Sequence, residues 1–183
     1  ELEYKYLGDW TDRPNNSNIE VDLLTASLKK RGYNQAQINV AVQKLTAEAN
    51  NHSRKMEGNN HAVYQLLRYG ISAKTEAGKP TDTIHLIHWD DPEKNDFALV
   101  EEVTLRGTHE RRPDLVLYIN GIAVAVIELK KGSTEIGDGI RQLLSNQTPQ
   151  FNDWFLPPYK SSLRVMILKV YATAPLAPKK RCF

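Results

Sequence analysis

Two almost continuous apolar runs, joined by Asn-Gly, constrain the fold of this 183-residue chain more than any other feature. The runs read DLVLYI at residues 114–119 and IAVAVIEL at residues 122–129. Strands that are covered on both faces have such runs, and Asn-Gly is the strongest short signal for a hairpin turn. We therefore predict a buried hairpin that turns at Asn120 and Gly121.

The segments around the hairpin predict a mixed α/β fold with a helical N-terminal part. Residues 1–17 resemble an irregular leader, whereas Asn18 and Asn34 are suited to cap the first two helices. Apolar residues recur at helical spacing after each cap, and Gly32 and Gly70 are expected to end the first and third helices. Four strands and a last helix are expected next, at residues 83–89, 97–105, 113–119, 122–129 and 133–147. This order favours a mixed central sheet flanked by helices.

Three charged residues of the hairpin, Asp114, Glu128 and Lys130, need an explanation, because charged groups are rarely buried unless they are paired or bind a metal. Glu128 and Lys130 are two positions apart on one strand and therefore share a face. A regular two-residue turn would place Asp114 opposite Ile127, on the other face from Glu128. A three-residue loop would place Asp114 opposite Val126, with Glu128 diagonally beside it. A site formed by all three residues therefore predicts an odd-length loop or a bulge.

Two carboxylates that converge at a sheet edge suit a hard cation such as Mg²⁺, which keeps several of its waters. Such an ion polarises a phosphoryl oxygen, lowers the pKa of a water and stabilises the charge of the transition state. A neighbouring lysine can orient that water or accept its proton. Asp, Glu and Lys in this pattern therefore indicate a phosphodiester hydrolase. The alternative is that the strand ends at ELKKG and its charges lie in solvent.

These residues also carry a resemblance to a known family. RPDLVLYINGIAVAVIELKKG followed by GIRQLLSNQ resembles the N-terminal nuclease domain of the restriction (R, or motor) subunit of type I restriction-modification enzymes. The resemblance extends back through LIHWDDPEKNDFALVEEVT, LLRYG and IEVDLLTASLKKRGY, and covers residues 1–155 as one endonuclease domain. It implies a PD-(D/E)xK restriction-endonuclease-like fold and Mg²⁺-dependent cleavage of double-stranded DNA. It also implies a complex with modification and specificity subunits.

The resemblance assigns roles to individual residues. Asp114 and Glu128 become metal ligands, the carbonyl of Leu129 completes the metal site, and Lys130 becomes the catalytic lysine. The sequence contains no G-x-x-x-x-G-K-[ST] motif, so the chain is not expected to bind ATP as P-loop proteins do. ATP is therefore expected to serve only motor domains outside this chain.

Two further positions match the family less well. Gln142 stands first in a Gln-x-x-x-Tyr motif that engages DNA in the family, but Asn146 stands where the tyrosine would be. Gln142 could equally be a solvent-facing helix residue. Glu20 on the first helix corresponds to an accessory acid, or else it is a first-turn acid that favours the helix dipole.

Other charged residues have two interpretations. Arg111, Arg112 and Lys131 flank the proposed site and can bind DNA phosphates without sequence preference, or else they only solvate the ends of the hairpin. His85 and His88 lie at odd separation in an expected strand, so they should face opposite sides and make a poor metal pair.

Bulk composition sets the wider limits. The net charge of +2 does not itself argue for nucleic acid, and one cysteine permits no internal disulfide, which suits the cytoplasm. No apolar run approaches the roughly 20 residues that span a bilayer, so no membrane partner is expected. Three rivals remain: an inactive DNA-binding or assembly module of the same fold, a stand-alone repair or resolvase nuclease, and a purely structural α/β domain.

Residues 156–183 form a tail of different character. The family resemblance stops after Phe155, and a one-base shift of the reading frame turns the tail into a segment similar to the family's continuation. We therefore expect this tail to be translated in the wrong frame and to pack poorly. Its segment SLRVMILKVYA nevertheless has enough apolar β-formers to pair with a sheet edge.

Overall fold

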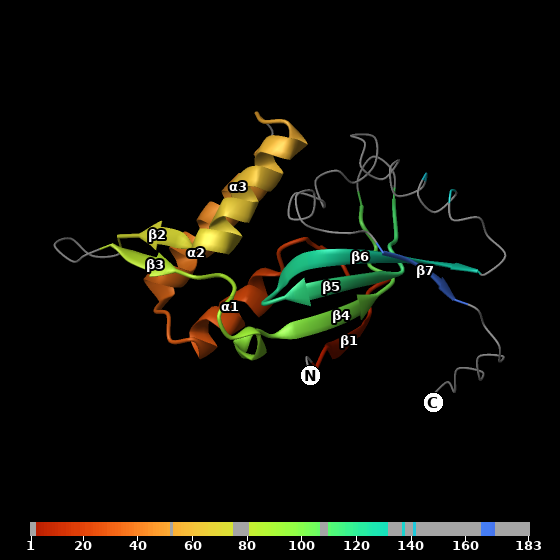
Figure 1. The fold of residues 1–183 in the computed structure, drawn as a ribbon, viewed down its shortest axis with the longest axis horizontal. Helices are drawn as coiled ribbons and strands as arrows, with labels where there is room; N and C mark the ends of the chain where they lie inside the picture. Colours follow the sequence, from red (N-terminus) through yellow and green to blue (C-terminus); the bar gives the residue numbers. More distant parts are fainter. Residues whose placement is uncertain are drawn as a thin grey trace.

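A computed structural model of the chain describes residues 3–51, 53–74, 81–106, 110–131, 137, 141 and 166–170. Within these residues a five-stranded sheet is accompanied by a two-stranded sheet and three α-helices, which gather at one end of the larger sheet (Figure 1). The larger sheet has the strand order β1 (Lys5–Asp9), β4 (Phe97–Glu101), β5 (Leu115–Ile119), β6 (Ile122–Lys131) and β7 (Met166–Val170).

The larger sheet is mixed, as the sequence predicts. Its outer pairs, β1 with β4 and β6 with β7, are parallel. Its inner pairs, β4 with β5 and β5 with β6, are antiparallel. The predicted hairpin is thus confirmed at the centre of the sheet, with a neighbour on each side.

The three helices are α1 (Val21–Lys30), α2 (Gln35–Ala49) and α3 (Met56–Tyr69). Asn34 caps α2 as predicted, with its side chain accepting from the N–H of Gln37 in a capping box. Gly70 ends α3 with a φ of 81°, which glycine adopts without strain. The prediction that Asn18 caps the first helix is wrong, because the N-cap of α1 is Glu20. The backbone carbonyl of Asn18 accepts the N–H of Ala123 at the start of β6.

Three strand predictions need correction. The strand expected at residues 97–105 ends at Glu101 as β4, because Glu102 has a φ of 50°. The leader of residues 1–17 contains β1, which is mostly exposed and interrupted by Gly8 at a φ of 101°, so no apolar alternation marks it. The strand expected at residues 83–89 is only β3 (Asp82–Ile84), which pairs with β2 (Ile71–Ala73) in the two-stranded sheet. Residues 85–91 leave that sheet and run to a short 3₁₀ turn, η1 (Pro92–Lys94), before β4.

Two hydrophobic clusters hold these elements. One joins the helices to the two-stranded sheet and reaches Ile122 of the hairpin, where Ile19 lies in an isolated bridge with it. The other covers one face of the larger sheet, where Trp10 packs on Tyr118 with ring centroids 5.7 Å apart. The segment that links β1 to α1 therefore closes over the face that carries the alternate residues of β5 and β6.

Several predictions concern residues beyond the described part. The helix expected at 133–147 lies almost wholly outside it, and of residues 156–183 only β7 is described. The parallel pairing of β7 with β6 agrees with the expectation that this segment pairs with a sheet edge. The reading-frame hypothesis and the boundary at residue 155 stay predictions. Among the described helices, each is too short or too polar to cross a bilayer.

Candidate active site

The turn of the central hairpin has the geometry that its sequence predicts. Asn120 has a φ of 52° and Gly121 a φ of 80°, so both lie in the left-handed region that a two-residue hairpin turn uses. The Asn120 side chain accepts hydrogen bonds from the Ser27 hydroxyl at 3.0 Å and the Asp96 N–H at 2.8 Å. This buried amide ties the turn to α1 and to the segment before β4.

A bulge in β6 decides which residues face each other across the hairpin. Ile119 pairs with Ile122 and Tyr118 with Ala123, but the register then shifts, so that Leu117 pairs with Ala125 and Leu115 with Ile127. Val124 is the extra residue.

One further step along this register places Asp114 opposite Glu128. Residues directly opposite share a face, with Cα atoms roughly 4.5–5.5 Å apart. The sequence left open a three-residue loop or a bulge, and the structure has a two-residue turn with a bulge. The predicted bulge is confirmed. Its register, continued by one residue, sets Glu128 directly opposite Asp114 instead of diagonal to it, and the shared face of the two carboxylates stays a prediction.

The two carboxylates lie in different surroundings. Glu128 is 3% exposed, on the face that Val116 and Val126 also cover. Asp114 is half-buried, and its Oδ2 accepts the backbone N–H of Leu129 at 2.5 Å. This short charge-assisted hydrogen bond fixes the Asp114 carboxylate against the peptide that follows Glu128.

The donor set is compatible with a divalent cation that also binds a phosphate. Among the described residues, no group of three His, Cys, Asp or Glu side chains could hold a metal by itself. Mg²⁺, however, is usually bound through one or two carboxylates together with waters and substrate phosphates. Asp114 keeps one carboxylate oxygen that bonds no described group, and Glu128 supplies the second carboxylate. The pair therefore fits a Mg²⁺ site that the phosphate completes.

The other residues of the predicted metal site are partly described. Leu129 is 40% exposed and lies next to Glu128 in β6. Lys130 and Lys131 follow in the same strand, and their side chains lie outside the described part. Their predicted roles stay predictions.

Glu20 belongs to a separate ion-pair cluster. Arg13 binds it through two hydrogen bonds, of 3.0 and 2.6 Å, and the N–H of Ser17 donates to the same carboxylate at 3.0 Å. The Glu20 backbone N–H donates to Gly121 at the turn, whereas Asp114 and Glu128 lie at the other end of the strands, roughly 20 Å away at 3.3 Å per residue. The described geometry pairs the Glu20 carboxylate with Arg13, and its role as an accessory acid stays a prediction.

The predicted DNA-binding residues are found in different settings. Arg112 is exposed, and its Nε lies 3.1 Å from a carboxylate oxygen of Glu102. Arg111 is half-buried and pairs through its backbone with Leu105 in an isolated bridge. Gln142 and Asn146 lie outside the described residues. Arg112 is thus already paired and Arg111 is only half-exposed, and the DNA-binding roles stay predictions.

Sequence reasoning missed two residues that hold the segment between β1 and α1 against the larger sheet. Tyr118 is fully buried and donates its hydroxyl to the Ser17 carbonyl at 2.9 Å. Burial, with Glu20 nearby, raises the pKa of the Tyr118 phenol well above its usual value. Arg13 also stacks on Trp10, with its Cζ 3.8 Å from the ring centroid. A tyrosine inside an apolar strand was a visible signal, whereas nothing local marks Arg13.

Comparison with known proteins decides the family. The family model for the N terminus of the type I restriction enzyme R protein matches residues 1–166. The chain belongs to this family. A relative from Methanocaldococcus jannaschii, named a type I restriction enzyme endonuclease subunit, is 31% identical over 120 residues. The alignment covers 61% of this chain and 10% of that relative, so the chain spans about a tenth of the relative's length. The resemblance seen in the sequence is thereby confirmed.

Proposed function

We propose that this chain is a Mg²⁺-dependent DNA endonuclease domain with a PD-(D/E)xK active site. The observation that carries the proposal is the bulge in β6. Its register, continued by one residue past Leu115 and Ile127, brings Asp114 opposite Glu128. Membership of the R protein N-terminal family and the endonuclease subunit named above support the same reading.

The residues have distinct tasks in this proposal. Asp114 and Glu128 hold the cation at the end of the hairpin, and the hydrogen bond from Leu129 keeps Asp114 in position. When bound, the ion neutralises charge on the phosphate and acidifies a water molecule. Lys130, two positions after Glu128, orients that water or accepts its proton. Arg111, Arg112, Lys131 and Gln142 bind DNA phosphates without sequence preference.

The wider setting of the proposal follows from the family. The substrate is double-stranded DNA, and sequence recognition belongs to a specificity subunit that assembles with a modification subunit. ATP serves the motor part of the R subunit. The protein acts in the cytoplasm. The second candidate function is an inactive DNA-binding or assembly module of the same fold.

Nicking of a supercoiled plasmid tests the proposal. The chain is incubated with Mg²⁺ or Mn²⁺ beside Asp114→Asn, Glu128→Gln and Lys130→Ala. Nicking should require the metal and should fall in each variant, by about 10²–10⁴-fold for the lysine that handles the proton.

Glu102→Gln is the matched control. Glu102 is a carboxylate close to Asp114, because the Glu102 backbone N–H donates to the Asp114 carbonyl. This variant should retain nicking. Thermal melting of every variant separates loss of chemistry from loss of fold, which matters most for the buried Glu128. Metal-dependent nicking that survives in Asp114→Asn would refute the assignment. Metal binding without any nicking by the parent chain would favour the inactive module.

A further inference from the structure

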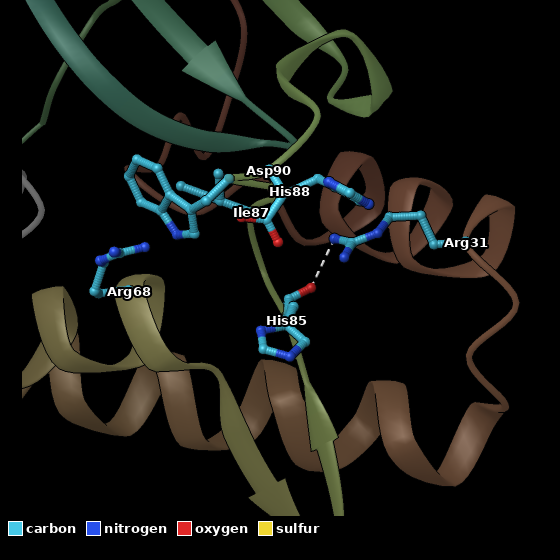
Figure 2. A pocket seen from close by; sticks show the side chains of 7 residues that line it. Arg31, Arg68, His85, Ile87, His88 and Asp90 are labelled. Atoms are coloured by element: carbon cyan, nitrogen blue, oxygen red, sulfur yellow. Dashed lines mark hydrogen bonds between the residues drawn. The ribbon is translucent and has the colours of Figure 1, made fainter.

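A pocket lies between the helical part and the segment that leads into β4 (Figure 2). Its volume is about 190 Å³. Arg31 reaches it from the end of α1 and Arg68 from the last turn of α3, on opposite sides of the 85–90 segment. The full lining is Arg31, Arg68, His85, Ile87, His88, Trp89 and Asp90.

This pocket corrects the prediction for the two histidines. His85 and His88 were expected to face opposite sides of one strand, but β3 ends at Ile84. Both histidines therefore lie in irregular backbone, and both line the same pocket.

The two arginines have unused hydrogen-bond capacity. Arg31 donates to the His85 carbonyl at 2.6 Å, and Arg68 lies over the Trp89 ring at 5.6 Å. In the part of the chain that the structure describes, neither guanidinium pairs with a carboxylate. Each guanidinium has five N–H donors in a fork that matches a phosphate.

Neighbouring cations behave differently. Lys30 is paired with Asp96 at 2.7 Å, and Lys94 with Asp91 at 3.1 Å. Arg31 and Arg68 lie at the C-terminal ends of helices, which favour cations. That interaction does not use the hydrogen-bond donors of the guanidinium groups. Asp90 is the one acid in the pocket lining, so two arginines against one carboxylate leave the pocket positive.

Trp89 gives the pocket a flat and fixed apolar surface. Its indole N–H donates to the Leu67 carbonyl at 2.8 Å, which holds the ring, and the residue remains 46% exposed. An exposed aromatic ring beside cations can contact the sugars of a DNA backbone while the cations contact its phosphates.

The pocket is rigidly connected to the central hairpin. The Asn120 side chain donates to the Leu86 carbonyl at 2.9 Å and to Asn95 Oδ1 at 2.8 Å, and Asn95 in turn accepts the N–H of His88. The pocket thus sits at the turn of the hairpin. Asp114 lies at the other end of β5, roughly 20 Å from this turn.

We propose that this pocket is a second DNA contact, which binds a backbone phosphate away from the phosphate at Asp114 and Glu128. The inference rests on the proposed nuclease function and adds a site to it. Arg31 and Arg68 bind the phosphate, and Trp89 contacts the adjoining sugar. Because phosphate contacts carry no sequence information, the pocket should raise the affinity for DNA and fix its position without selecting a base sequence.

Fluorescence anisotropy with a labelled DNA duplex tests this site. The whole chain is titrated at several KCl concentrations in EDTA, so that the DNA is not cut, beside the double variant Arg31→Gln, Arg68→Gln. Affinity should fall about tenfold, and the slope of log K against log[salt] should become shallower by about one. The loss should be equal for two unrelated duplex sequences.

Two control variants sharpen the test. Lys29→Gln removes an exposed charge from the same helix outside the pocket lining and should leave the slope unchanged. Trp89→Leu keeps the charges but removes the flat ring, and it should weaken binding without changing the slope. Circular dichroism establishes that each variant is folded.

Each remaining outcome is decisive. A folded double variant with the affinity and slope of the parent overturns the pocket, and it leaves the nuclease proposal standing if nicking still depends on Asp114. A parent chain that binds no duplex at any salt concentration overturns both. Broadening of the ³¹P signal of inorganic phosphate by the parent, with unchanged DNA affinity in the double variant, assigns the pocket to a free anion and overturns the DNA contact.

Discussion

Replacing Arg13 with alanine should destabilise the fold more than neutralising its partner Glu20. The Glu20 side chain is 7% exposed, whereas the Arg13 side chain is 35% exposed. Without Arg13, a buried carboxylate keeps only the Ser17 N–H as a described donor. Breaking a fully buried pair costs about 3–5 kcal/mol. Because Arg13 is about one-third exposed, we lower this to about 2–3 kcal/mol for Arg13→Ala.

The opposite change is milder. Glu20→Gln leaves a neutral amide that still accepts from Ser17, and the released guanidinium can turn toward water. We expect a cost of about 1 kcal/mol. For a domain of this size, 1 kcal/mol corresponds to about 2–4 °C in Tm. Thermal denaturation should therefore lower Tm by about 4–12 °C for Arg13→Ala and by about 2–4 °C for Glu20→Gln.

A matched control is Lys30→Ala, which removes a salt bridge whose side chains are 66% and 48% exposed. It should cost under about 1 kcal/mol. The reasoning fails if Glu20→Gln destabilises as much as Arg13→Ala. It also fails if Glu20→Gln abolishes nicking while Tm is unchanged, because Glu20 would then be the accessory acid that the family resemblance allows.

Two further substitutions test the packing around the hairpin. Tyr118→Phe should lose about 1–2 kcal/mol at neutral pH, since the Ser17 carbonyl loses its donor. Because the pKa of Tyr118 is raised in the folded state, its contribution to stability is present below the usual phenol pKa of 10.0 and is lost as pH rises above that value. The free energy of unfolding, measured by urea titration, should therefore fall less steeply at alkaline pH in the variant than in the parent. An equally steep fall would contradict this. Gly121→Ala should cost about 2–4 kcal/mol, because its φ is 80° and a Cβ would lie 2.6 Å from the Leu24 nitrogen; an unchanged denaturation midpoint would show that α1 does not pack against the turn as described.

Much of the fold follows from local patterns in the sequence. Asn-Gly between apolar runs specifies the turn, Asn34 specifies the start of α2, and Gly70 specifies the end of α3. Each of these signals acts within a few residues, through backbone conformations that glycine or asparagine adopts at low cost. Membership of the R protein N-terminal family was also visible in extended stretches around the hairpin.

The remaining features depend on contacts between distant residues. β1 is mostly exposed and carries no apolar alternation, so only its pairing with β4 defines it. The bulge at Val124 leaves no mark in the apolar pattern of the strand. It was predicted only because a site formed by both carboxylates requires them to share a face. Arg13 meets Glu20 through the loop that covers the sheet. Propensity cannot locate such contacts, since tertiary packing decides them.

The central claim is that Asp114 and Glu128 jointly bind one divalent cation at the end of the hairpin. Electron paramagnetic resonance of Mn²⁺ measures this directly, because bound and free Mn²⁺ give different signals and Mg²⁺ competes for the same site. The parent chain should bind one Mn²⁺ that Mg²⁺ displaces. Asp114→Asn and Glu128→Gln should each abolish this binding, and Glu102→Gln should retain it. Binding that persists in Asp114→Asn, or a folded parent chain that binds no Mn²⁺, would contradict the account.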